Sequence, residues 1–279
     1  MIQVDKVPIF YRANKKVQKY FKEGRGRGVG KDYIPWTKTH THEFSSKGRA
    51  TRTLGIKTGR IHHLQSDNQY RAFLLFEFNK RVTDIRESYP LLDVMEVIDE
   101  KDDLRFDKFR NKETKEPYVI TTNFLLTVKK EDGSENLVAR TVKNVSELNR
   151  KITWEGLEIE RRYWLQKNID WKVITNKQLP RQLAKNIEWV RETLLPGSGH
   201  DVAKETLSIK LLRYLLDYSN ITLREVLRLF DKNENVAKGT GLYLFRYLIA
   251  TREINVDMNK KIVFSSLVGD LIKIGGIDK

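Results

Sequence analysis

Cysteine is absent from the 279 residues of this chain. Its absence excludes both a disulfide framework and a metal site built from thiolates. The chain also lacks an apolar run long enough to cross a bilayer, and its amino-terminal residues lack the apolar core of a signal peptide. These absences are typical of a soluble intracellular protein, so we expect no membrane partner.

Acidic residues are sparse over the first 60 positions. Residues 1–60 hold 15 Lys or Arg against 4 Asp or Glu, a net charge of +11 out of +15 for the whole chain. Such a segment attracts phosphates and releases their counterions. The alternatives are a solvated basic surface and a tail that binds an acidic partner, but interleaved aromatic residues favour nucleic acid. We therefore predict a DNA-contacting segment over residues 1–60 that leads into a nuclease domain.

The candidate DNA contacts are basic side chains and imidazoles within this segment and just beyond it. They are Arg25, Arg27, Lys31, Lys57, Arg60, His62 and His63. The two histidines are adjacent, and adjacent side chains on a strand point to opposite faces, so they rarely share a metal ion. We expect them to contact the DNA backbone or to have a structural role.

The pattern over residues 61–195 predicts an α/β domain, a mixed sheet with flanking helices. Ser66 opens a helix, and Gln69 three positions later completes a capping box. Alternating β-branched residues over Tyr118–Lys143, interrupted by a turn at residues 131–134, predict a hairpin. The other expected elements are extended pieces at Val82–Arg86 and Tyr89–Leu92, a helix from Ser146 to Asn168, a strand at Asp170–Thr175 and a helix from Pro180 to near Leu195.

A small second domain is predicted after a glycine-containing linker at residues 196–201. Its expected elements are helices at Val202–Tyr218, Thr222–Asp231 and Val236–Arg252, and a hairpin that pairs Ile254–Val256 with Ile262–Ser265. Three helices followed by a hairpin describe a winged helix over residues 202–279.

Four polar residues point to chemistry at the sheet. Thr141 and Lys143 lie two apart on one strand, so their side chains share a face. Asn123 lies on the partner strand, and Gln69 lies on the preceding helix. Metal-assisted hydrolysis of a phosphodiester needs carboxylates for Mg²⁺ and a Lys that stabilises the developing charge. Taken alone the pattern is weak, because a lone Lys at a strand end is usually solvated.

Several segments together carry a more specific signal. They occur in order over roughly residues 20–195 and are GRGRGVGKDYIPW, KTGRIHHLQSDNQYRAFLLFEFN, VTDIRESYPLL, ITTNFLL, ARTVKN, LEIERRYWLQKNIDWKVIT and NIEWV. These segments resemble the TnsA family, the endonuclease subunit of heteromeric cut-and-paste transposons. The segment YLFRYLIATREINVDMNK is similar to the carboxy-terminal domain of the same family.

The resemblance implies a restriction-endonuclease-like fold and a place in the bacterial cytoplasm, with the chromosome. It implies cleavage of the 5′ (non-transferred) strand at transposon ends, together with a DDE-type transposase. An AAA+ ATPase regulator is the second implied partner and contacts the carboxy-terminal domain. Mg²⁺ is the implied cofactor, with Mn²⁺ as an alternative. The family's catalytic positions fall on Gln69, Asn123, Thr141 and Lys143, and its metal ligands on the first three.

The departures from the family pattern decide what activity to expect. Gln69 and Asn123 stand where the family has carboxylates, and an amide attracts Mg²⁺ far less than a carboxylate. We therefore expect a catalytically disabled site. Two explanations stay open: a natural loss of catalysis, or a deliberate inactivation, which the shape-conserving swaps favour. The alternative functions are a non-catalytic scaffold that bridges transposase and ATPase, and a winged-helix transcription factor.

Overall fold

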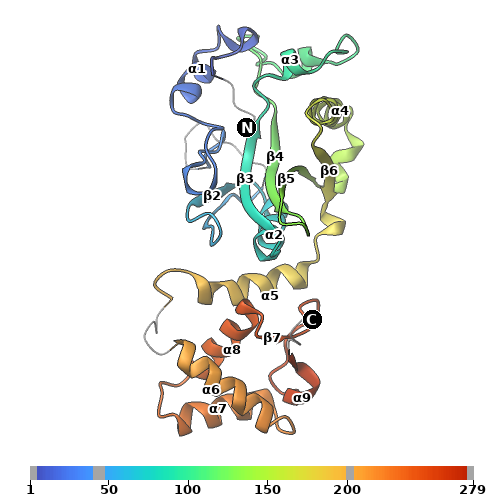
Figure 1. The fold of residues 1–279 in the computed structure, drawn as a ribbon. Coiled ribbons are helices and arrows are strands. Elements are labelled where there is room, and N and C mark those ends of the chain that lie inside the picture. The colour runs from blue at the N-terminus through green and yellow to red at the C-terminus, as the bar shows by residue number, and fades with distance from the viewer. Residues whose placement is uncertain (1–4, 40–47, 199–203, 275–279) are drawn as a thin grey trace. The chain divides into compact units, whose positions relative to one another are not determined.

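The computed structural model describes residues 5–39, 48–198 and 204–274 (Figure 1). The chain divides between Leu179 and Pro180 into two compact units. After a short 3-10 helix at Ile9–Tyr11, the first contains α1 (Lys15–Lys22) and a two-stranded antiparallel sheet of β1 (Thr51–Leu54) and β2 (Ile61–Leu64). Within the described residues, no helix is both apolar enough and long enough to span a membrane.

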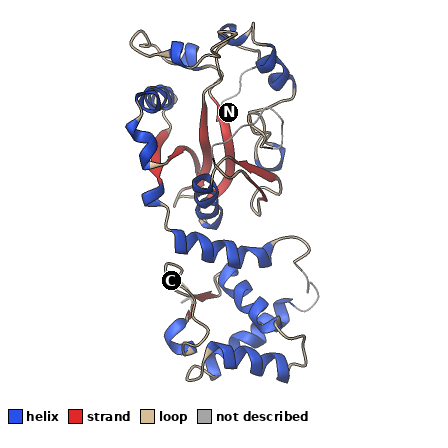
Figure 2. Cartoon of the chain, turned by 180° about the vertical axis from the view of Figure 1, so that it is seen from behind, coloured by secondary structure: helices blue, strands red, loops and turns tan. Residues whose placement is uncertain are grey.

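A four-stranded mixed sheet forms the centre of the first unit, and Figure 2 shows it from behind. Its strands in spatial order are β3 (Val82–Pro90), β4 (Thr121–Lys129), β5 (Glu135–Lys143) and β6 (Asp170–Thr175). Strand β4 is antiparallel to both of its neighbours, β3 and β5, whereas β5 and β6 are parallel. The predicted mixed sheet is confirmed, and the strand Asp170–Thr175 has the predicted bounds.

Two helices cover opposite faces of this sheet. On one face, Phe76 of α2 (Asp67–Phe78) lies against Phe124 of β4, with ring centroids 5.3 Å apart. The next residue of β4, Leu125, packs with residues of α4 (Lys151–Gln166). Because successive side chains of a strand point to opposite faces, α2 and α4 lie on opposite sides. A short helix, α3 (Val94–Val97), packs beside α4.

Two predicted elements differ from the structure. The two extended pieces around Ser88 are one continuous strand, β3. The helix expected from Ser146 begins later: a short 3-10 helix at Val145–Asn149 comes first, and α4 starts at Lys151. Asn144 is the residue that caps this first turn, in a capping box with Glu147, so the chain bends before α4 begins.

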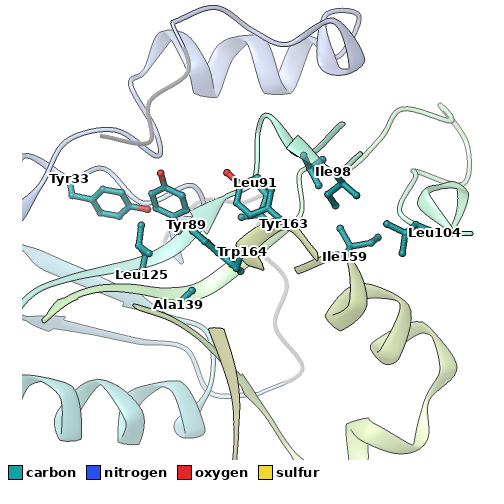
Figure 3. Close-up of a cluster of buried hydrophobic side chains, with 11 residues drawn as sticks. Tyr33, Tyr89, Leu91, Ile98, Leu104, Leu125, Ala139, Ile159, Tyr163 and Trp164 are labelled. Atoms are coloured by element: carbon teal, nitrogen blue, oxygen red, sulfur yellow. The ribbon is translucent and has the colours of Figure 1, made fainter. Parts of the chain in front are cut away.

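A hydrophobic cluster fixes α4 against the sheet (Figure 3). The ring of Tyr89 stacks on Tyr33 with centroids 6.4 Å apart and lies 5.8 Å from the ring of Trp164. Leu125 and Ala139 complete the sheet side of the cluster, and all five residues are buried. This packing determines which residues of α4 face the ends of the central strands.

A buried ion network joins the β1–β2 sheet to β3. Glu87 of β3 is 1 % exposed, and its Oε2 lies 2.6 Å from a guanidinium nitrogen of Arg60 and 2.7 Å from Nδ1 of His62. The second ring nitrogen of His62 also has a partner, because Nε2 lies 2.7 Å from the hydroxyl of Thr58. Burial alone would raise the pKa of Glu87, but the charge and hydrogen bonds of His62 and Arg60 hold that pKa below its ordinary value.

The second unit contains five α-helices, a 3-10 helix at Glu192–Leu194 and two short strands among its described residues. The α-helices and strands are α5 (Arg181–Arg191), α6 (Lys204–Asp217), α7 (Leu223–Asn233), α8 (Thr240–Thr251), α9 (Val268–Leu271), β7 (Ile254–Asn255) and β8 (Lys273–Ile274). The three predicted helices are α6, α7 and α8. Helix α8 starts later than predicted because Asp231 accepts hydrogen bonds from the N–H groups of Gly239 and Gly241, both at 2.7 Å.

The predicted terminal hairpin is wrong. Strand β7 pairs antiparallel with β8 and not with residues 262–265. The carbonyls of Phe264 and Ser266 instead accept from the N–H groups of Arg224 and Leu223, at 2.9 and 3.0 Å, at the start of α7. The backbone that was expected to form part of the hairpin therefore accepts hydrogen bonds from N–H groups in the first turn of α7, which have no acceptor within that helix.

The division between the units also differs from the predicted linker at 196–201. Helix α5 was assigned to the nuclease domain, but it belongs to the second unit, where it packs on α8. Its apolar residues Ala184, Ile187 and Val190 are buried, and Arg246 of α8 donates to the carbonyl of Trp189 at 2.9 Å. The helix against which α5 packs follows it in the chain, so α5 belongs to the second unit. Residues 199–201 of the predicted linker lie outside the described residues.

The Glu87 network yields a stability prediction. Glu87→Gln should lower the free energy of unfolding of the first unit by about 3–5 kcal/mol at neutral pH, because it leaves Arg60 buried without its partner. Since the folded-state pKa of Glu87 is lowered, its contribution is present above the ordinary value of 4.5 and is lost as the pH falls. Urea denaturation at several pH values measures both effects. The exposed Glu113→Gln is the matched control, and an equal loss in both variants would contradict the prediction.

Candidate active site

The side chain of Asn123 bridges two strands of the central sheet. The β4–β5 pairing runs from Lys129 opposite Glu135 to Phe124 opposite Arg140. At the next step of β4, the side-chain Oδ1 of Asn123 accepts a hydrogen bond from the backbone N–H of Val142 at 2.7 Å. The amide of Asn123 thus replaces a rung of the ladder and lies close to the end of β5, one residue before Lys143.

An irregularity in the sheet explains why this side chain turns toward β5. Thr122 faces α4, because its hydroxyl donates to Glu160 at 2.7 Å, whereas Phe124 faces α2. Two residues that are two apart normally share a face. The alternation therefore breaks at Asn123. Ser88, between the paired residues Glu87 and Tyr89 of the neighbouring strand, has a positive φ of 49°.

Thr141 and Lys143 lie beside a buried carboxylate of α4. The hydroxyl of Thr141 donates to Glu160 Oε2 at 2.5 Å and accepts from Nε1 of Trp171 at 3.1 Å. Burial raises the pKa of Glu160, while the hydrogen bonds of Thr141 and Thr122 and the charge of Lys143 oppose the rise without cancelling it. The ammonium of Lys143 makes no hydrogen bond to the described part of the chain.

Gln69 lies in the first turn of α2, where it is 9 % exposed. Its backbone N–H donates to the hydroxyl of Ser66 at 3.2 Å, so half of the predicted capping box is present. Its side-chain Oε1 accepts from the N–H of Gln65, at 2.9 Å, and not from that of Ser66. Helix α2 packs against β3 and β5. Among the described residues, no hydrogen bond joins Gln69 to Asn123 or Lys143.

The residues at these positions do not fit Mg²⁺ or Mn²⁺. Both ions prefer oxygen ligands that carry negative charge. The side-chain oxygens of Gln69 and Asn123 already accept backbone hydrogen bonds, and the hydroxyl of Thr141 donates a hydrogen bond to Glu160. Glu160 is the carboxylate of this group, and burial favours its neutral form. No cluster of three His, Cys, Asp or Glu side chains suited to a metal occurs among the described residues.

Most of the predicted DNA contacts have structural partners. Arg60 and His62 belong to the Glu87 network, and Nδ1 of the buried His63 lies 3.1 Å from the hydroxyl of Thr39. Arg25 is 4 % exposed; it pairs with Glu23 and stacks 3.4 Å from the centre of the Tyr20 ring. These buried side chains present little or no surface to a phosphate, and direct contact by them stays a prediction.

Three predicted contacts lie at or nearer the surface. The ammonium of Lys57 donates to the carbonyls of Asn79 and Val82, at 2.9 and 2.5 Å. The guanidinium of Arg27 lies 4.0 Å from the centre of the Phe21 ring. Lys31 is exposed. These residues stay candidates, with Lys31 the most accessible.

Two features are not among the predicted site residues. The first is a row of exposed lysines on α1: Lys15, Lys19 and Lys22 follow helical spacing, while Val17 and Tyr20 are buried. The second is Glu160. Its signal was present, because it lies three residues after Leu157 and three before Tyr163, on the apolar face of a helix. An acidic residue on a buried face requires partners of its own.

The chain is similar to known proteins over most of its length. A family model described as TnsA-like endonuclease N terminal matches residues 79–176, which include Asn123, Thr141 and Lys143 but not Gln69. A second, described as TnsA endonuclease C terminal, matches residues 178–258. The transposon Tn7 transposition protein TnsA of Escherichia coli is 37% identical over 208 residues, which cover 74% of this chain and 70% of that protein.

The buried Glu160 yields a prediction about pH. Its folded-state pKa is raised, so its contribution to stability is full below the ordinary value of 4.5 and is lost as the pH rises through the folded-state pKa. Glu160→Gln should remove this loss, because a neutral amide has no charge to desolvate. Urea midpoints at pH 5 and pH 8 give the measurement, with the exposed Glu131→Gln as control. A wild-type-like loss in Glu160→Gln would contradict the assignment.

Proposed function

The chain belongs to the TnsA endonuclease family, and from this premise we propose that it is a DNA-end-binding subunit of a Tn7-type transposition system with a disabled cleavage site. In this role it occupies the position at which the 5′ (non-transferred) strand is cut. With Gln69 and Asn123 in place it does not cut that strand, or cuts it slowly.

One observation carries the proposal. The Lys of the family site is kept at Lys143, next to the residue that binds Asn123, while amides stand at both carboxylate positions. Hydrolysis needs a metal to bind the phosphate and to activate the water. Without carboxylates the site keeps a cation for the phosphate but loses the ligands for the metal. Binding therefore survives the change, and catalysis does not.

Chemically, the proposed residues have separate roles. Lys143 faces the phosphate and offsets its charge, as charged donors do at phosphoryl sites. Thr141 does not face the substrate; it anchors the end of β5 through Glu160. Asn123 orients the same strand end through Val142. We assign the positioning of Lys143 to these last two residues.

The proposed DNA-binding face includes α1. Lys15, Lys19 and Lys22 are exposed, and their buried neighbours Val17 and Tyr20 fix the helix to the first unit. A rigid row of ammonium groups suits the phosphate backbone and carries no sequence information. Lys31, which directly follows the glycine-containing loop, is also exposed and is a further candidate contact. The +11 charge of residues 1–60 supports a backbone contact of this kind.

The proposed partners are those that the family resemblance implies. A DDE-type transposase cuts and joins the 3′ ends, and an AAA+ ATPase regulator contacts the second unit. Helix α6 of that unit exposes Ile209 and Leu216, which are 53 % and 45 % exposed and lie two turns apart on one face. Apolar side chains in such a row are suited to a protein contact. They support the second candidate, a natural scaffold that bridges transposase and ATPase without cutting DNA.

Restoring the carboxylates separates a disabled enzyme from a scaffold. We expect Gln69→Glu with Asn123→Asp to nick the 5′ strand at transposon ends in Mg²⁺ when the transposase is present. The double variant restores a carboxylate at both family ligand positions, and recovery should be at least about a hundredfold, the lower range of losses from single catalytic groups. Strand-specific end labelling measures the nicks. If the double variant folds and binds DNA but makes no nicks, the result would support the scaffold.

The α1 surface yields a prediction about salt. Replacing Lys15, Lys19 and Lys22 by Ala should weaken DNA binding and reduce the slope of log affinity against log salt by about 3, since each phosphate contact contributes about 0.9. Fluorescence anisotropy over a salt series gives the slope. Alanine at the exposed Lys108, Lys130 and Lys177 is the matched control. Equal slopes for the two triple variants would exclude α1 from the interface.

A further inference from the structure

We propose that the rim formed by Asn123 and Lys143, called the amide rim below, binds a phosphate anion directly and without a divalent cation. The conversion of an acid to an amide at position 123 has then changed the ligand of the site from a cation to an anion. The proposal rests on the proposed function only for the identity of the phosphate, which we take to be one of the DNA backbone.

The orientation of the Asn123 amide is fixed by its neighbour. The two ends of a side-chain amide are usually assigned from their hydrogen-bond partners. Here the partner is the backbone N–H of Val142, which can only donate, so the oxygen of Asn123 must face it, at 2.7 Å. The NH₂ group is therefore directed away from β5. It makes no hydrogen bond to the described part of the chain, and it can only donate.

Gln69 is oriented by the same logic. Its Oε1 accepts from the backbone N–H of Gln65, at 2.9 Å, so its NH₂ group is also the end left for other partners. Both amides at the family's carboxylate positions therefore turn their acceptor toward the backbone, and their NH₂ groups make no hydrogen bond to the residues that the structure describes. A carboxylate at either position would accept the same backbone bond and keep a second, charged oxygen for a metal.

Lys143 adds a full positive charge to the amide rim. It follows Val142 directly on β5, and its ammonium makes no hydrogen bond to the residues that the structure describes. The charge of Lys143 opposes the rise in the pKa of Glu160, and this buried carboxyl already accepts hydrogen bonds from the hydroxyls of Thr122 and Thr141. The surface that the amide rim presents is therefore made of donors: the NH₂ of Asn123 and the NH₃⁺ of Lys143.

Such a surface favours a negatively charged ligand over a positively charged one. A phosphate offers several acceptor oxygens and negative charge, and hydrogen bonds from charged donors to phosphate are among the stronger ones in proteins. A divalent cation would meet amide hydrogens and an ammonium instead of oxygens. The amide rim should therefore bind phosphate equally well with and without Mg²⁺, and a single Asn123→Asp change should reverse that behaviour.

DNA affinity with and without metal tests the reversal. Fluorescence anisotropy with a labelled duplex is measured for the full chain in EDTA and in Mg²⁺. Wild type should bind equally in both. Asn123→Asp should bind about tenfold to a hundredfold more weakly in EDTA, the range for losing a charge-assisted hydrogen bond, and Mg²⁺ should restore the affinity. The variant keeps the acceptor for Val142, so its fold is expected to survive, which circular dichroism checks.

A matched control and a second probe complete the test. Asn136→Asp places the same charge at an exposed site on the neighbouring strand β5, and it should change the affinity little and without dependence on Mg²⁺. The second probe is inorganic phosphate, titrated while the side-chain NH₂ resonance of Asn123 is followed by NMR. This resonance should shift in wild type and stay unchanged in Lys143→Gln.

The two probes separate the possible failures. If no DNA binds to any variant while phosphate shifts the Asn123 resonance, the proposed function fails and the anion site stands. If DNA binds but Asn123→Asp and Asn136→Asp behave alike, or wild type requires Mg²⁺, the anion site is wrong and the proposed function is untouched. An unchanged Asn123 resonance in phosphate would also overturn the anion site.

Discussion

The hydrogen bond from the Val142 N–H to the side chain of Asn123 is the contact on which the candidate site depends. It closes a gap in the β4–β5 ladder at the point where the alternation of β4 breaks. It therefore has a structural role that does not require charge, since an amide and a carboxylate can both accept it. This explains how the site can keep its shape when the acid at this position is replaced.

Two buried glutamates show opposite solutions to the cost of burying a charge. Glu87 is paired with Arg60 and His62, and these partners lower its pKa despite burial. Glu160 receives neutral hydroxyl donors, with Lys143 nearby, and its pKa is raised. The first network fixes the amino-terminal segment to the sheet. The second supports the strand end that bears Lys143, so it connects the hydrophobic packing of α4 to the candidate site.

Much of the fold followed from local patterns. The hairpin, the strand at Asp170–Thr175 and the capped helices starting near Ser66 and Thr222 are all encoded by alternation, turn residues and caps. The terminal hairpin could not be predicted in this way, because β8 is distant from β7 in the sequence and the expected partner binds the start of α7. The sequence also could not show which basic residues are buried in ion pairs and which are exposed. Charge composition cannot distinguish Arg60, paired with a buried acid, from an exposed Lys such as Lys31.

An amide rim that presents donors should exclude divalent cations. Mn²⁺ is a sensitive probe of this exclusion, because a bound paramagnetic ion broadens NMR resonances close to it. We expect the backbone N–H of Val142 and the side-chain NH₂ of Asn123 to keep their linewidths when Mn²⁺ is added to the wild-type chain. Selective, saturable broadening of these two resonances would contradict this expectation.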